Sequence, residues 1–204
     1  MKQIHFSEKS GDMQLVIDGR ITQAREIVPI FDVSKLKRTI SLGLDVKGRC
    51  VLLLDGKIYI YTAYNIGDVV PVAQSFQSRY MEILERVKDE VLRDTLREFA
   101  PFISAESTSD ANIPCHHVCI SNIRVERLQD ISDADCLASG VRKVGSDNGE
   151  AGYVYEEPYR VFYSPTDIFA TPREAYMVHN NRDPRLRTWD RNPYVVVYDF
   201  ELID

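Results

Sequence analysis

The sequence lacks the features of two large protein classes. It contains no run of roughly 18 or more apolar residues that could cross a bilayer, and it does not open with positive charge followed by an apolar stretch. It also lacks an excess of positive charge, because the net charge is −6 and the pI about 5.3. We therefore expect a cytoplasmic protein with no membrane partner, and no sequence-independent binding to duplex nucleic acid.

Cysteine is scarce as well, and its spacing does not favour a metal. One string, Cys115-His116-His117-Val118-Cys119, resembles half of a zinc site, but no second pair at ligand spacing accompanies it. The string also has the composition of extended chain, in which His116 would point away from its Cys and His neighbours. We predict free thiols, no metal site and no cofactor.

What the chain does contain is enough apolar material for a core. Hydrophobic residues make up 44% and aromatic residues 10% of the 204 residues, which suits one folded domain over residues 1–204. No internal repeat is visible. The composition therefore excludes a disordered chain.

Turn and capping residues mark the elements. Strands are expected at residues 3–6, 25–31, 50–54, 57–63, 69–76, 115–128 and 194–202, and helices at 11–18 and 133–139, with a further helix that begins at Pro172. Gly19 suits the end of the first helix, Asp55-Gly56 suits a hairpin turn, and Pro71 suits an edge strand. Ser132 and Thr171, each followed three residues later by an acidic residue, suit helix N-caps.

Residues 78–100 break the strand pattern. Apolar residues recur there at helical spacing, with Glu and Arg on the opposite face. Pro101 ends the run, and a polar stretch follows at residues 104–112. We predict a helical insertion at 78–112. The fold class is then α+β: a small mixed β-barrel or curled sheet with peripheral helices and an inserted amphipathic helix.

Four strings carry a resemblance to a known family. They are MQLVIDGRITQAR (13–25), GDVVPVAQSF (67–76), IRVERLQDISDADCLASGV (123–141) and TWDRNPYVVVYDFELI (188–203). In this order they resemble the phage and prophage group of the ASCH-domain family, which shares the PUA-like fold. The resemblance implies a β-barrel whose cleft accepts RNA, a nucleotide or a modified nucleoside, in a bacterial host cell.

The family's signature, Gly-x-Lys-x-x-Glu-x-Arg, falls on this chain from Gly19. Its lysine and glutamate positions hold Ile21 and Ala24, and Gln74 stands where phage relatives often have glutamate. Amide hydrolysis needs titrating groups that orient and deprotonate a nucleophile or water, and these side chains cannot do so. The resemblance therefore implies binding without catalytic residues. A nucleoside amidohydrolase or ribonuclease would require a rearranged site, with Glu26 or a carboxylate from residues 150–157 as replacement.

The resemblance also implies a ligand site, in which Thr22, Gln23 and Arg25 match the phage variant of the signature. The candidate ligand-binding residues are Gly19, Thr22, Gln23, Arg25, Gln74 and Trp189. Their polar groups are of the kind that read base edges or phosphates. The alternative is structural: Thr22 and Gln23 could serve a helix end or strand, and Trp189 could pack in the core. Two basic stretches, 35–49 and 180–193, are either RNA contacts or solvated loops.

A second class of function stays open. The apolar face of the helix at 78–100 must be covered by the domain or by another chain. If the helix protrudes, it would serve a protein partner or a homodimer, and the chain would be an interaction module. A pocket bordered by Thr22, Arg25 and Gln74 would instead favour RNA or a nucleotide-like ligand.

Overall fold

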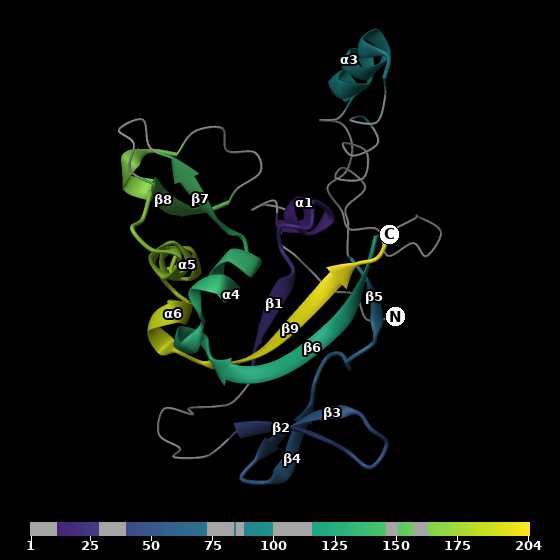
Figure 1. The fold of residues 1–204 in the computed structure, drawn as a ribbon, viewed down its shortest axis with the longest axis vertical. Helices are drawn as coiled ribbons and strands as arrows, with labels where there is room; N and C mark the ends of the chain where they lie inside the picture. The colour runs from purple at the N-terminus through teal and green to yellow at the C-terminus, as the bar shows by residue number, and fades with distance from the viewer. Residues whose placement is uncertain are drawn as a thin grey trace.

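The computed structural model describes residues 12–28, 40–72, 84, 88–99, 116–145, 151–156 and 163–204. These residues form an α+β fold in which every paired strand is antiparallel to its neighbour. The strands form a four-stranded sheet in the order β1-β9-β6-β5, a three-stranded sheet β2-β3-β4 and a pair β7-β8 (Figure 1). No described helix has the length and apolar character needed to cross a bilayer.

The elements have the following bounds. The strands are β1 Gln23–Ile27, β2 Ile40–Leu44, β3 Cys50–Leu54, β4 Lys57–Tyr61, β5 Val69–Pro71, β6 His117–Arg127, β7 Val141–Gly145, β8 Ala151–Tyr155 and β9 Tyr194–Leu202. The helices are α1 Asp12–Ile17, α3 Glu90–Phe99, α4 Asp133–Ala138, α5 Pro172–Asn180 and α6 Thr188–Arg191, with 3₁₀ turns η3 Leu128–Asp130 and η4 Pro165–Asp167.

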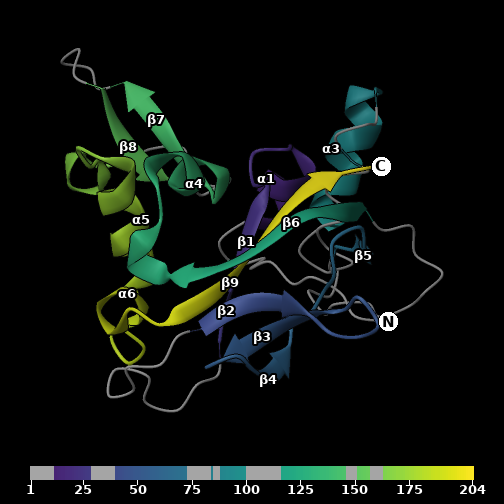
Figure 2. The same ribbon diagram turned by 60° about the horizontal axis from the view of Figure 1, so that its bottom comes forward.

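Strand β9 lies between two hydrophobic cores and supplies residues to both. Val196 and Tyr198 point into the core shared with β6, α1 and the three-stranded sheet, whereas Val195 and Val197 point into the core shared with α4, α5 and α6. Successive side chains of a strand point to opposite faces, so a strand buried on both faces needs a continuous apolar run. Figure 2 shows α4 and α5 on one side of β6 and β9 and the three-stranded sheet on the other.

Several sequence predictions are confirmed. Asp55 and Gly56 both have positive φ, at 51° and 78°, as the two-residue turn between β3 and β4 requires. Pro71 lies in β5, at the edge of the four-stranded sheet. Ser132 and Thr171 each accept a hydrogen bond from the backbone N–H three residues later, and at Thr171 the capping box is complete.

Other predictions need correction. The helix expected over 78–100 is not continuous, because Lys88 and Asp89 are not helical and α3 begins at Glu90. The Asp89 carboxylate accepts the Leu92 N–H at 3.0 Å, which places Asp89 at the helix N-cap, where the backbone is extended. Strand β1 begins at Gln23, two residues earlier than predicted.

The expected barrel is not closed by the described strands. They form three separate sheets, joined around the two cores that share β9, and only isolated bridges such as Ile21–Ser139 extend the pairing. The α+β class is therefore confirmed at the coarse level. The predicted strand at 3–6, the end of the strand at 29–31 and the loop at 104–112 lie outside the described residues.

Candidate functional site

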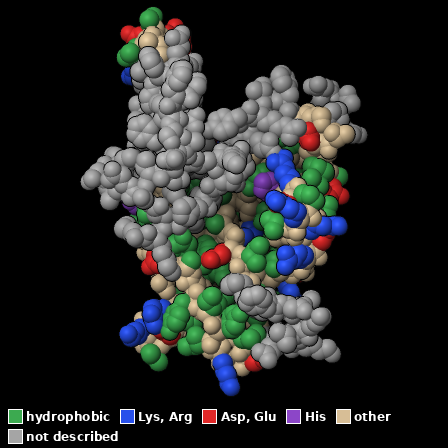
Figure 3. All heavy atoms as spheres, turned by 180° about the vertical axis from the view of Figure 1, so that it is seen from behind, with side chains coloured by type: hydrophobic (Ala, Val, Ile, Leu, Met, Phe, Trp, Pro, Cys, Tyr) green, Lys and Arg blue, Asp and Glu red, His purple; other side chains and the backbone are tan. Residues whose placement is uncertain are grey.

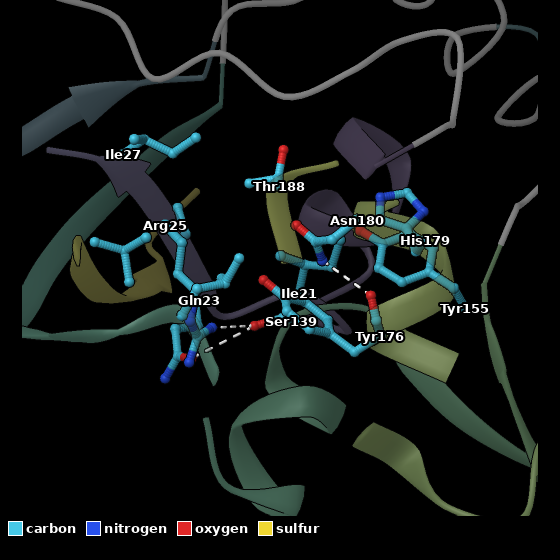
Figure 4. Close-up of a pocket in the computed structure, with 13 residues that line it drawn as sticks. Ile21, Gln23, Arg25, Ile27, Ser139, Tyr155, Tyr176, His179, Asn180 and Thr188 are labelled. Carbon is cyan, nitrogen blue, oxygen red and sulfur yellow. Dashed lines mark hydrogen bonds between the residues drawn. The ribbon is translucent and has the colours of Figure 1, made fainter. Parts of the chain in front are cut away.

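A pocket of about 300 Å³ opens beside β1. It lies over the core that β9 shares with α4, α5 and α6, which we call the second core. It is lined by Ile21, Gln23, Ala24, Arg25, Ile27, Leu128, Ser139, Tyr155, Tyr176, His179, Asn180, Thr188 and Val195. Figure 4 shows Gln23 and Arg25 on one side and Tyr155 and His179 on the other, with Thr188 and Asn180 between them. We call this cavity the aromatic pocket.

The polar side of the aromatic pocket is held by hydrogen bonds. The Gln23 amide donates to Asp135 at 2.8 Å and to Asp199 at 2.6 Å. The Arg25 guanidinium, only 5% exposed, donates to the Ser139 hydroxyl at 2.6 Å and to Glu126 at 3.2 Å. Alternate residues of β1 share a face, so Gln23 and Arg25 reach this network together.

Arg124 completes the network beneath the pocket. It contacts Asp135 and Asp199 at 2.8 Å and Glu126 at 3.2 Å. Burial raises the pKa of Asp135, but hydrogen bonds from Gln23 and Ser132 and the nearby arginine charges outweigh it and hold that pKa below its ordinary value. Two guanidinium groups thus meet three carboxylates. Arg25 therefore brings no net positive charge to the pocket.

The aromatic side is a stacked pair. The rings of Tyr155 and His179 lie with centroids 3.4 Å apart and planes inclined by 9°. The His179 Nδ1 atom is buried and has no hydrogen-bond partner among the described residues. Burial and the charge of Arg182 lower the pKa of His179 to about 4, so the ring is neutral at pH 7. The pair thus offers an apolar surface with one unused polar nitrogen.

A glycine makes room for the stacked pair. Gly140 follows α4 with φ of +104°, a conformation that favours glycine. A Cβ atom at this position would lie 3.2 Å from both the Tyr155 ring and the Ile21 side chain. The glycine that ends α4 therefore also lets Tyr155 approach the pocket.

The lining has little capacity for acid–base chemistry. None of the described residues in it is Asp, Glu, Lys or Cys. The Ser139 hydroxyl accepts from Arg25 and donates to Gln23 at 3.4 Å, so no base among the described residues lies in position to activate it. Neutral His179 is a weak base at pH 7 because its pKa is about 4.

The candidate residues from the sequence are only partly brought together. Gln23 and Arg25 line the aromatic pocket, as do Ile21 and Ala24 at the family's lysine and glutamate positions. Gln74 lies outside the described residues.

The remaining three candidates have other places. Gly19 ends α1 with φ of +69°, and its N–H donates to the Val16 carbonyl. The exposed Thr22 uses its backbone to bond Ala138 and Phe200, and its side chain is not part of the pocket lining. Trp189 lies in the second core, edge-on to Tyr176 with ring centroids 6.3 Å apart.

Two basic stretches and two carboxylates were further candidates. In the described part of 35–49, Arg49 pairs with Asp45, and in 180–193, Arg185 and Arg187 pair with Asp183 and Asp190. Glu26 accepts a hydrogen bond from the Tyr198 hydroxyl, and Glu156 pairs with arginines in a separate cavity. Neither carboxylate lines the aromatic pocket.

The residues that sequence reasoning missed are Ser139, Tyr155, Tyr176, His179, Asn180 and Thr188. They come from four segments that meet only in the fold, and a single histidine near the end of a helix gives no signal of its own. Metal ligands do not converge either: within the described ranges no three His, Cys, Asp or Glu side chains could hold an ion. His116 and His117 instead bond Asp204.

Comparisons with known proteins add no relative. No family model, no curated protein sequence and no solved structure matches the chain. The ASCH resemblance therefore stays a prediction from the sequence strings, and the function has to be inferred from the pocket.

Proposed function

We propose that this protein is an ASCH-related domain of the PUA-like class that binds RNA or a nucleotide-like ligand, with a base held in the aromatic pocket and no turnover. The observation that carries the proposal is the pocket itself. It combines the stacked pair Tyr155–His179 with the compensated network of Gln23, Arg25 and Ser139. Its volume of about 300 Å³ lies at the lower end of the range of small-molecule sites.

The polar atoms of the pocket suit a nucleobase. Nδ1 of neutral His179 and Nε of Arg25 have no hydrogen-bond partner among the described residues. Nδ1 is an acceptor when the ring proton is on Nε2, and the exocyclic amino and ring N–H groups of bases are donors. Both atoms are buried in the free protein, so a bound base has to displace neighbouring atoms to reach them. Aromatic side chains are common stacking partners of unpaired bases.

Binding without turnover is supported by the residues at the family's catalytic positions. Ile21 and Ala24 present apolar groups to the pocket where the signature has lysine and glutamate. Nothing in the described lining replaces them, because Glu26 bonds Tyr198 and Glu156 lies in another cavity. A bound amide would meet hydrogen-bonding groups but no activated nucleophile.

The test is a binding measurement on His179→Phe. This variant keeps an aromatic ring for stacking and removes Nδ1, an atom that stabilises nothing in the free protein. Anisotropy of fluorescent single-stranded RNA and DNA oligomers, and calorimetry with nucleosides, would be measured at two salt concentrations. We expect saturable binding by wild type and about a tenfold or greater loss in the variant, as for a missing buried hydrogen bond.

His117→Phe is the matched control, because His117 lies on β6, bonds Asp204 and does not line the pocket. It should bind like wild type. The proposal fails if wild type shows no binding at tens of micromolar concentration, or if His179→Phe binds every ligand as tightly as wild type does.

A second candidate function is an interaction module, favoured by α3. Val91 and Leu92 on this helix are 78% and 50% exposed, and α3 stands apart from the sheets in Figure 1. Light scattering of wild type and Val91→Asp would test self-association. A larger species that the variant does not form would favour a homodimer, whereas a monomer in both would remove that support.

A further inference from the structure

A second cavity, of about 600 Å³, is lined by Arg20, Gly140, Val141, Arg142 and Glu156. We call it the arginine cleft. Three of its residues are the chain neighbours of aromatic-pocket residues: Arg20 adjoins Ile21, Gly140 adjoins Ser139, and Glu156 adjoins Tyr155.

The chain segments that carry these neighbours lie side by side. Ile21 bridges Ser139, and the Glu156 N–H donates to the Gly140 carbonyl at 2.8 Å. The arginine cleft and the aromatic pocket therefore lie next to one another, separated by these segments.

Among the residues that the structure describes, the lining of the arginine cleft carries two positive charges and one negative charge. Glu156 is buried and accepts a hydrogen bond from Arg20 Nη1, and Arg142 Nε lies 3.2 Å from the same oxygen. Two guanidinium groups thus share one carboxylate. Their side chains are 54% and 43% exposed, so both can reach a ligand from solvent.

One hydrogen-bond donor of this cleft is unpaired. Arg142 Nε is buried and lies within ion-pair distance of Glu156 but not in hydrogen-bonding geometry, and it has no other partner among the described residues. A guanidinium matches the oxygens of a phosphate with paired N–H groups. In Figure 3, Lys and Arg side chains gather on the side of the molecule formed by β7, β8, α5 and α6.

We propose that the arginine cleft is a phosphate site, in which Arg20 and Arg142 bind a phosphate group of the ligand whose base occupies the aromatic pocket. The inference rests on the proposed function and deepens it, because it makes the ligand a nucleotide or an RNA strand and not a free nucleoside. Glu156 holds the two arginines in place and competes with the phosphate for them.

Variants on the two faces of β7 give the test. Arg142→Gln removes one charge from the arginine cleft, and Lys143→Gln, the control, removes one charge from the next residue, which points to the opposite face of the strand. Glu156→Gln removes the competing carboxylate. Binding of pyrophosphate, a nucleoside, the matching nucleoside monophosphate and single-stranded RNA would be measured at several salt concentrations by calorimetry and fluorescence.

We expect Arg142→Gln to weaken pyrophosphate, monophosphate and RNA binding about fivefold or more and to leave nucleoside binding unchanged. The logarithmic salt slope for RNA should fall by about 0.7 for each phosphate that the variant no longer neutralises. Glu156→Gln should bind pyrophosphate more tightly, and Lys143→Gln should match wild type.

Other results separate this inference from the proposed function. Equal effects of Arg142→Gln and Lys143→Gln on every phosphate ligand overturn the phosphate site, even if His179→Phe no longer binds the nucleoside. A third result is that wild type binds pyrophosphate, that only Arg142→Gln weakens this binding, and that neither nucleoside nor RNA binds. The arginine cleft would then bind free phosphate compounds, and the proposal that it acts together with a base in the aromatic pocket would be overturned. If Glu156 formed only a structural ion pair, Glu156→Gln would not bind pyrophosphate more tightly than wild type.

Discussion

Arg25 and Arg142 line neighbouring cavities, and their surroundings differ in one respect. Arg25 is almost fully buried, forms ion pairs with Glu126 and Asp135, and donates a hydrogen bond to Ser139. Arg142 is nearly half exposed and shares one carboxylate with a second arginine. The same side chain is therefore a structural cation in one cavity and an available one in the other.

The comparison teaches that an arginine in a pocket lining does not by itself indicate an anion site. A buried guanidinium must be compensated, because desolvation of an unpaired charge costs several kcal/mol. The carboxylates that compensate the guanidinium neutralise the positive charge that would otherwise bind a phosphate. Sequence reasoning favoured Arg25 as the ligand contact, and the structure makes it part of a closed network in which Arg124 and three carboxylates take part.

The largest expected effect is that of removing Arg25. Arg25→Met removes a nearly buried guanidinium, leaves the partly buried Glu126 and Asp135 with one arginine fewer, and should lower the free energy of unfolding by about 3–5 kcal/mol, measured by urea denaturation. Arg49→Met is the control, since Arg49 pairs with Asp45 at the exposed surface. Equal denaturation midpoints for both variants would show that the difference between buried and exposed arginines has been misjudged.

The next effect concerns pH and His179. Its pKa is about 4 in the folded protein and 6.5 in an unfolded chain, so between these values only the unfolded state takes up the proton. Stability is fully present above pH 6.5 and declines as the pH falls towards 4, by on the order of 3 kcal/mol at 1.36 kcal/mol per pKa unit. Urea denaturation of wild type and His179→Phe from pH 4 to 7 isolates this contribution. Parallel pH curves would contradict it.

Gly140 couples the two cavities, because it lines the arginine cleft and contacts Tyr155 of the aromatic pocket. Gly140→Ala should cost about 2 kcal/mol, from the strain of positive φ and the displacement of Tyr155. Gly48→Ala, at φ of +75° with nothing within 4 Å of the added Cβ, carries the strain alone and should cost about 1 kcal/mol. Thermal denaturation compares the two, and equal losses would mean that the contact with Tyr155 is negligible.

The smallest effect on stability is expected in the arginine cleft. Arg142→Gln should change the free energy of unfolding by less than about 0.5 kcal/mol, because the Arg142 side chain is 43% exposed to solvent and Arg20 remains paired with the buried Glu156. Its effect should appear in ligand binding instead. A loss of stability comparable to that of Arg25→Met would make Arg142 a structural residue and remove the contrast between the cavities.

Local signals in the sequence were sufficient for many elements. Asp55-Gly56, Ser132 and Thr171 act on backbone groups a few residues away, and each lies where it was predicted to lie. The amphipathic stretch at 78–100 failed at Asp89. Asp89 is an N-cap because its carboxylate accepts a hydrogen bond from the Leu92 N–H. The spacing of apolar residues carries no information about such a bond, so it predicted one continuous helix.

The site was less predictable than the elements. Gln23 and Arg25 could be singled out because the strings around them resemble a family, but their bonds to Asp135, Asp199, Glu126 and Ser139 depend on which strands and helices meet. Trp189 was a candidate on composition, and the fold places it in the core. Whether a side chain is buried depends on which other elements pack against it, and the sequence around Trp189 does not show this.

The sequence by itself determined the α+β class, the turns and the caps, because these depend on contacts within a short stretch of chain. Only the tertiary structure decided which side chains share a cavity, since Ile21, Ser139 and Tyr155 come together through strand pairing across long separations. It also decided which charges are compensated. That is why His179 and Arg142, which carry no signal in the sequence, become the residues on which the proposed function is tested.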